Sequence, residues 1–88
     1  MDKIKAELTA ITEKYKKDYS NRFDRNGKSD TLKNNVMLVA DLQLKLAEEL
    51  AVTTKSYYKN HNVIDTYEID QFRNDLYMSF IQFSTTFE

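Results

Sequence analysis

The sequence has no proline, cysteine or tryptophan, and only one glycine and one histidine. Proline and glycine are the strongest breakers of regular structure, so their scarcity predicts long helices joined by few turns. Without cysteine, neither a disulfide nor a thiolate nucleophile is available, and one histidine does not make a zinc site. Helix packing or self-association must therefore stabilise the chain.

Other signatures of chemistry are missing as well. Gly27 stands alone, so no glycine-rich loop can hold a phosphate, and no Glu-x-x-His pair is present for a di-iron centre. A Ser-His-Asp arrangement would have to use His61, and no nucleophile elbow of small residues surrounds any serine. We therefore expect a non-enzymatic protein with no cofactor and no metal site.

Long hydrophobic runs are also lacking. The longest unbroken apolar run is Val36–Ala40, whereas a membrane-spanning helix needs about 20 apolar residues. The segment Met1–Glu7 has no apolar core of a secretory signal. We expect a cytoplasmic protein without membrane contacts.

What is present is a single small domain of 88 residues, 41% of them hydrophobic, with a net charge of −1. The charge is uneven. Residues 1–33 carry nine Lys/Arg and six Asp/Glu, a net of +3, and residues 34–88 carry four and eight, a net of −4. Ten lysines against three arginines, with seven asparagines, indicate an A+T-rich gene such as that of a low-GC bacterium or its phage.

Apolar residues recur at helical spacing in three stretches. The first predicted helix runs from Asp2, its N-terminal cap, to about Arg22. Its apolar stripe consists of Ile4, Leu8, Ile11, Tyr15 and Tyr19. Asn26-Gly27 is the one strong turn signal, with Gly27 suited to end a helix and Ser29 or Asp30 to cap the next.

The second predicted helix runs from Thr31 to about Lys59, and apolar residues cover more than half of its circumference. One face holds Leu32, Val36, Val39, Leu46, Leu50 and Tyr57. An adjacent face holds Met37, Ala40, Leu44, Ala47 and Ala51. Such a wide apolar arc predicts a helix covered on two sides.

The third predicted helix follows a polar break at Asn60-His61-Asn62. Asp65 and Glu68 have the spacing of a capping box, and Ile64 with Ile69 that of a hydrophobic staple. The inner stripe consists of Ile69, Phe72, Leu76, Phe80, Phe83 and Phe87. These patterns predict an all-α fold, a small antiparallel three-helix bundle, with four or five helices if the second region breaks near Ala51.

Residues 46–59 read Leu-Ala-Glu-Glu-Leu-Ala-Val-Thr-Thr-Lys-Ser-Tyr-Tyr-Lys. This segment resembles the helix-turn-helix of bacterial and phage DNA-binding regulators, although Ala51 replaces the usual turn glycine. The resemblance implies a bend near Ala51 and a second helix capped by Thr53. The residues that would face DNA are Thr54, Lys55, Tyr58 and Lys59, beside the cap. The alternative is one continuous helix ending near residue 60.

The third helix also has apolar residues outside its inner stripe, namely Tyr77, Met78 and Ile81, and Tyr58 similarly points away from the face of Tyr57. Aromatic and methionine side chains near a surface are typical of binding patches. Our leading hypothesis is therefore protein–protein binding through Tyr58, Tyr77, Met78 and Ile81. The protein would act as an adaptor or inhibitor encoded by a phage or mobile element, with another protein or a second copy as its partner.

Two further hypotheses stay open. One is the DNA-binding regulator, in which nucleic acid is the partner. The other is a helical secretion partner or an immunity protein, which would have a cognate effector.

Overall fold

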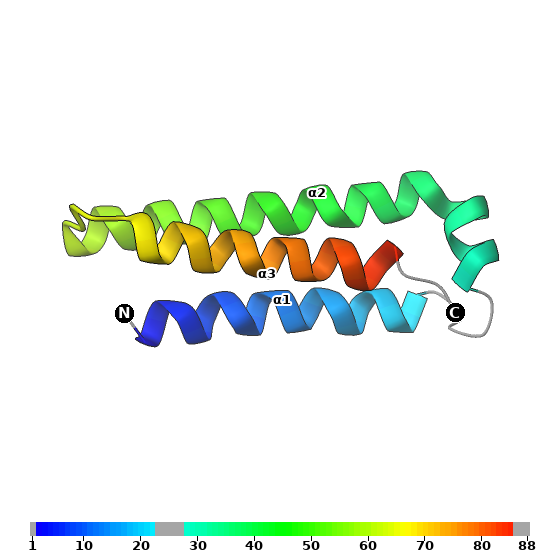
Figure 1. Ribbon diagram of the computed structural model, residues 1–88, viewed down its shortest axis with the longest axis horizontal. Helices are drawn as coiled ribbons and strands as arrows, with labels where there is room; N and C mark the ends of the chain where they lie inside the picture. Colours follow the sequence, from blue (N-terminus) through cyan, green and yellow to red (C-terminus); the bar gives the residue numbers. More distant parts are fainter. Residues whose placement is uncertain (1, 23–27, 86–88) are drawn as a thin grey trace.

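The computed structural model describes the backbone of residues 2–22 and 28–85 and the side chains of residues 3–21 and 37–85. These residues form three α-helices, α1 (Asp2–Arg22), α2 (Lys28–His61) and α3 (Tyr67–Thr85), and no strand occurs among them. The helices α1 and α3 run in the same direction and α2 runs antiparallel to both, in a rod of 46 × 20 × 18 Å (Figure 1). The predicted three-helix bundle is confirmed.

The helix boundaries agree closely with the sequence pattern at α1 and less closely at α2. The observed limits of α1, Asp2–Arg22, are those predicted. The helix α2 begins at Lys28 rather than Thr31, so Ser29 and Asp30 lie inside its first turn rather than before it. It continues without a break past Ala51, so the alternative of four or five helices is wrong. The predicted turn at Asn26-Gly27 lies outside the described residues, as do Phe87 and the side chains of Asp2, Leu32 and Val36.

The end of α2 is formed by a backbone motif rather than by glycine. Asn62 adopts a positive φ of 51°, which asparagine tolerates better than most residues. The amide of Val63 then donates to the carbonyl of Tyr58 over 3.1 Å, the six-to-one hydrogen bond of a Schellman motif. The chain therefore turns back toward the bundle over few residues.

The start of α3 differs from the predicted capping box. The Asp65 carboxylate accepts a hydrogen bond from the Tyr67 amide at 3.1 Å, not from the amide three residues on. Glu68 pairs instead with the Lys5 ammonium of α1 at 2.6 Å. The hydrophobic staple is also absent, because the side chain of Ile64 is 98% exposed. A cross-helix ion pair has replaced the local contact that the spacing indicated.

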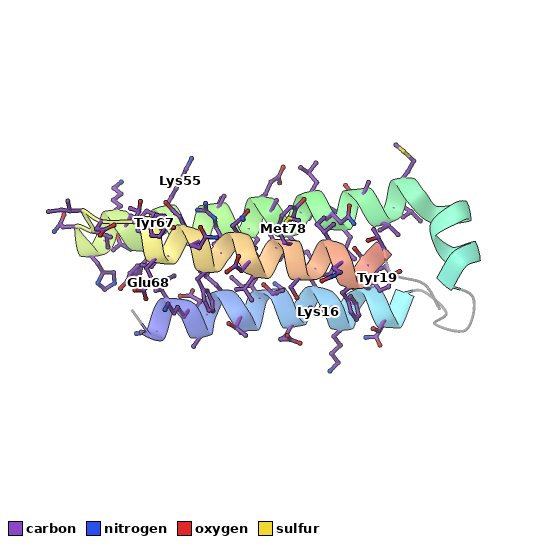
Figure 2. All side chains as sticks on the ribbon, viewed as in Figure 1. Lys16, Tyr19, Lys55, Tyr67, Glu68 and Met78 are labelled. Carbon is purple, nitrogen blue, oxygen red and sulfur yellow. The ribbon has the colours of Figure 1, made fainter. Side chains whose placement is uncertain are left out.

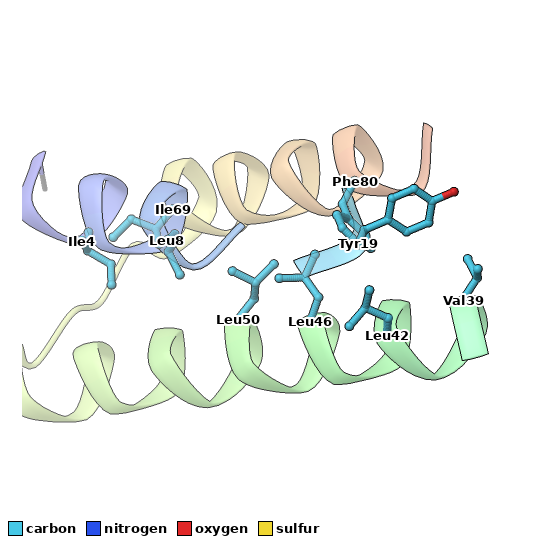
Figure 3. Close-up of a cluster of buried hydrophobic side chains, with 9 residues drawn as sticks. All are labelled: Ile4, Leu8, Tyr19, Val39, Leu42, Leu46, Leu50, Ile69 and Phe80. Carbon is cyan, nitrogen blue, oxygen red and sulfur yellow. The ribbon is translucent and has the colours of Figure 1, made fainter. Parts of the chain in front are cut away.

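The core lies along the axis between the three helices (Figure 3). Its buried apolar side chains are Ile4, Leu8, Tyr19, Val39, Leu42, Leu46, Leu50, Ile69 and Phe80. The predicted inner stripes of α1 and α3 supply five of the other side chains packed against it, Ile11, Tyr15, Phe72, Leu76 and Phe83. The second apolar face predicted for α2 is not covered, because Met37 is 78% and Leu44 57% exposed.

The polar side chains of Thr12, Thr54 and Ser84 are buried among these apolar ones. The hydroxyls of Thr12 and Thr54 donate to the carbonyls of Leu8 and Leu50, one turn earlier in their own helices. Such back-bonding satisfies a buried hydroxyl without a partner from another helix. Every buried side-chain nitrogen and oxygen in the described part of the chain has a hydrogen-bond partner. None of the three described helices combines the length and apolar character needed to cross a bilayer.

Candidate functional site

The apolar residues singled out on α3 lie where this helix runs beside α2, as Figure 2 shows for Met78. Met78 is 55% exposed, whereas Tyr77 and Ile81 are half-buried. Tyr77 packs against the core as well as reaching the surface. The three residues sit within one turn of each other, so they form a continuous apolar strip on the outer side of α3.

A matching strip runs along α2. Leu44, Ala47 and Ala51 are spaced three and four residues apart, which places them on one side of the helix. Leu44 is mostly exposed and the two alanines are half-buried. The apolar pattern of α2 predicts that this strip is covered, whereas Leu44 is 57% exposed. The exposure of Leu44 shows that this strip lies at the edge of the surface that α2 buries around Leu46 and Leu50.

The two strips meet at the seam between the helices. A shallow hollow of about 120 Å³ lies there, lined by Ala47, Leu50, Arg73, Asn74 and Tyr77. We call the surface formed by both strips the α2/α3 face. It consists of Leu44, Ala47 and Ala51 of α2 and Tyr77, Met78 and Ile81 of α3. Small alanine side chains beside bulky exposed ones give a groove into which another apolar element can pack.

Hydrogen bonds fix the seam at both ends of this face. At one end the Gln43 amide donates to the Ser84 hydroxyl over 2.8 Å. At the other end the Tyr58 hydroxyl donates to the Asp70 carboxylate over 2.6 Å. Because the two helices are held at both ends, the groove between them is built before any partner arrives.

Tyr58 therefore has a different place from the one predicted for it. It was expected to present its ring outward to a partner, but it is half-buried and its hydroxyl is taken up by Asp70. Burial, followed by the hydrogen bond to Asp70, raises the pKa of Tyr58 to about 12. The hydrogen bond from Tyr58 in turn lowers the pKa of Asp70, helped by Thr66 and Arg73. This group joins α2 to α3.

The two seams that involve α1 are bridged by charged groups. Between α1 and α2, Lys14 pairs with Glu49 at 3.0 Å and the Tyr15 hydroxyl donates to Glu49 at 2.9 Å. Burial and the bond to Glu49 raise the pKa of Tyr15 to about 12. Bonds from Lys14 and then Tyr15 lower the pKa of Glu49 against an opposing effect of burial.

Between α1 and α3, Lys5 pairs with Glu68, and the Lys16 ammonium donates to the Ser79 hydroxyl over 3.1 Å. The same lysines lie over the rings of Phe72 and Phe83, at 5.4 and 5.8 Å from the ring centroids. Ion pairs thus span both α1 seams, and the 67% exposed side chain of Val52 also lies at the α1/α2 seam. The α2/α3 face differs from them because no ion pair crosses it among the described residues, and the hollow at its middle is lined by Arg73 and Asn74 as well as by apolar side chains.

The helix-turn-helix arrangement is not formed. Residues 46–59 lie inside the continuous helix α2. Thr54, which would face DNA, is buried and bonded to the Leu50 carbonyl, while Thr53 is half-buried. Lys55 and Lys59 are exposed. The physical reason is that Ala51 favours helix where the motif needs glycine, so Leu50 and Thr54 remain one turn apart on the same buried side.

A pocket of about 440 Å³, more polar than the hollow of the α2/α3 face, lies between the start of α1 and the end of α2. Its lining includes Lys3, Glu7, Thr53 and Asn60. His61, which the sequence pattern places in the polar break between two helices, is exposed, forms the last residue of α2 and stacks on Tyr57 with ring centroids 4.4 Å apart. The described residues contain no group of three His, Cys, Asp or Glu side chains close enough to hold a metal ion.

Comparison with known protein families, curated proteins and solved structures finds no match to this chain. The candidate site is therefore defined by geometry alone. Of the predicted residues, Tyr77, Met78 and Ile81 do come together, and Tyr58 lies at the end of the same seam with a structural role. Leu44 was missed as a site residue, although its position well outside the stripe of Leu46 and Leu50 was a usable signal.

Proposed function

We propose that this protein is a non-enzymatic helical module that binds another protein through the α2/α3 face. The single observation behind the proposal is the contrast between the three seams. Ion pairs join α1 to both of its neighbours, whereas none joins α2 to α3 among the described residues, and Leu44 and Met78 beside that seam are more than half exposed. Large exposed apolar side chains gathered around small ones are typical of interaction surfaces on small domains.

The size and composition fit an adaptor or inhibitor encoded by a phage or mobile element and working in the cytoplasm. A rigid bundle needs no rearrangement to bind, so the ordering cost of association stays small. The few aromatic and methionine side chains of the face would act as its anchors. The alternative of a DNA-binding regulator has less support, because residues 46–59 lie within one continuous helix.

The test is to replace exposed residues of the face by charges. The double variant Leu44→Glu/Met78→Glu places two carboxylates on the α2/α3 face without touching the buried core. Its matched control is Val52→Glu, since Val52 is 67% exposed and lies on the α1 side of α2, in the lining of the polar pocket. Each tagged variant is used to capture partners from the native host, after circular dichroism has verified equal helicity.

We expect the wild type and Val52→Glu to capture the same protein and the double variant to lose it. Capture that is unchanged in the double variant, or lost equally in Val52→Glu, would reject the α2/α3 face as the binding surface. Sedimentation of the wild type then separates the two kinds of partner. A monomer is expected if the partner is another protein, and a dimer dispersed by Leu44→Glu/Met78→Glu if it is a second copy.

A further inference from the structure

The charges around the α2/α3 face restrict what can dock on it. On the outer flank of α2, Asp41 and Glu48 each lie within one turn of Leu44. On the outer flank of α3, Asp75 lies one turn from Met78. Carboxylates therefore border the apolar groove on both sides.

Few cations neutralise these carboxylates. Asp41 pairs with Lys45 at 3.1 Å, and Asp75 accepts only an amide hydrogen bond, from Gln71 at 3.4 Å. Glu48 is exposed and has no ion-pair partner among the described residues. Lys55 lies one turn beyond Ala51, toward the loop that joins α2 to α3, and Arg73 is engaged with Asp70 at 3.1 Å. The middle of the groove thus has an acidic border.

From this we infer that the α2/α3 face takes an amphipathic helix of another protein, with an apolar stripe toward the groove and Lys or Arg on both flanks of that stripe. The inference rests on the proposed function and names its partner class. A groove between two antiparallel helices has the straight form of the fourth position in a four-helix bundle. The alanines at 47 and 51 allow a helix to approach to the usual spacing of about 8–10 Å between axes.

Charge distinguishes a basic helix from the two other candidate occupants of the face, a second copy of the chain and a nucleic acid. In a symmetric dimer both copies would bring Glu48 and Asp75 to one interface, and Lys55, which has no ion-pair partner among the described residues, lies beyond Ala51 toward the loop end of the face. Nucleic acid would set phosphates against the same carboxylates. A basic amphipathic helix gains attraction on both flanks and loses no apolar contact, so it is the complementary partner.

The experiment uses two fluorescein-labelled peptides of about 18 residues, long enough to lie along α3. Both have leucine and alanine at helical spacing on one side. One has lysine on the two flanks of that stripe and the other has glutamate. Binding to the full chain is measured by fluorescence anisotropy at low ionic strength. We expect the lysine peptide to bind about tenfold more tightly, a size typical of a few exposed charge pairs.

Two variants with the same change in net charge locate the effect. Glu48→Lys/Asp75→Lys reverses the border of the groove and should reverse the preference between the peptides. Glu7→Lys/Glu13→Lys alters exposed carboxylates of α1 by the same amount and should leave the preference in place. Loss of the preference in both variants would mean attraction to overall charge and would overturn the inference.

The remaining outcomes separate this inference from the proposed function. If both peptides bind equally and Leu44→Glu/Met78→Glu abolishes both, the face binds helices without regard to charge and only the basic partner class is wrong. If neither peptide binds, the helical occupant is wrong, while the capture experiment still decides whether the face binds a protein of another shape. Tight binding of the lysine peptide that Leu44→Glu/Met78→Glu leaves unchanged would reject the face itself.

Discussion

Three leucines close together in α2 show how a displacement of two residues along a helix decides the role of a side chain. Leu42 and Leu46 are buried, whereas Leu44, between them, is 57% exposed. Their spacing of two also occurs in strands, but in a helix it turns the middle side chain away from the outer two. The same chemical group therefore stabilises the fold at two positions and is available for binding at the third.

This difference predicts unequal effects of truncation. Leu46→Ala removes a fully buried side chain and should lower the free energy of unfolding by about 3 kcal/mol, most of the roughly 5 kcal/mol expected for so small a core. Leu44→Ala should change it by less than about 0.5 kcal/mol. Urea unfolding followed by circular dichroism measures both. Similar losses for the two variants would mean that α2 is rotated relative to the structure described above.

The bond between Tyr58 and Asp70 predicts a pH dependence. Tyr58→Phe removes a hydrogen bond to a carboxylate, so we expect a loss of about 1.5 kcal/mol near neutral pH. Because folding raises the pKa of Tyr58 from 10.0 to about 12, this contribution is present below pH 10 and disappears as the pH rises through about 12. Because folding lowers the pKa of Asp70 from 3.8, its contribution is present above that value and disappears in acid.

Unfolding measured between pH 3 and 12 should therefore show the wild type and Tyr58→Phe converging at both extremes and differing most in between. The phenolate absorbance near 295 nm gives a second readout, since one tyrosine fewer should titrate close to pH 12 in the variant. Parallel stability curves across the whole range would contradict the assigned bond.

At the scale of single residues, sequence patterns located core side chains well and partners poorly. Periodicity identified the inner side of each helix, because burial follows the helical repeat. It did not show that Glu68 pairs with Lys5 or that the Tyr58 hydroxyl donates a hydrogen bond to Asp70. Such contacts depend on how neighbouring helices are placed in space. Leu44 was assigned to a covered face for the same reason.

At the scale of the elements, the main question was whether residues 46–59 turn or continue. A Leu-Ala-x-x-Leu segment serves equally well as the first helix of a DNA-binding motif and as the middle of a long amphipathic helix. The deciding residue is Ala51, which costs nothing in a helix and gives no advantage in a turn that needs positive φ. The ends of α1 were predictable, whereas the cap of α3 involves the carboxylate of Asp65 and a different amide from the one expected.

Ala51→Gly tests the continuity of α2 directly. Glycine in the interior of a helix costs about 1 kcal/mol relative to alanine, so the variant should be destabilised by that amount. In a helix-turn-helix, glycine at this position would be neutral or stabilising. Thermal unfolding followed by circular dichroism distinguishes the two results, and an unchanged or raised midpoint would refute the continuous helix.

At the scale of the whole molecule, the three seams of the bundle differ in the interactions that hold them together. Ion pairs and hydrogen bonds bridge the seams of α1 to its neighbours, while in the described part of the chain hydrogen bonds hold the α2–α3 seam near its two ends. A bundle arranged in this way can leave one groove open without losing its fold. The position of that groove depends on all three helices at once, so the sequence indicated the residues of α3 but not their counterparts on α2.

The central claim is that the α2/α3 face is where a partner docks, and methyl NMR on the intact protein tests it most directly. The lysine-flanked peptide is added while the methyl signals of Leu44, Met78 and Ile81 are followed together with that of Val52 on the α1 side. We expect the first three to shift with a common affinity and Val52 to stay in place. Shifts confined to Val52 and its surroundings, or no shift in Leu44 and Met78 at saturating peptide, would contradict the claim.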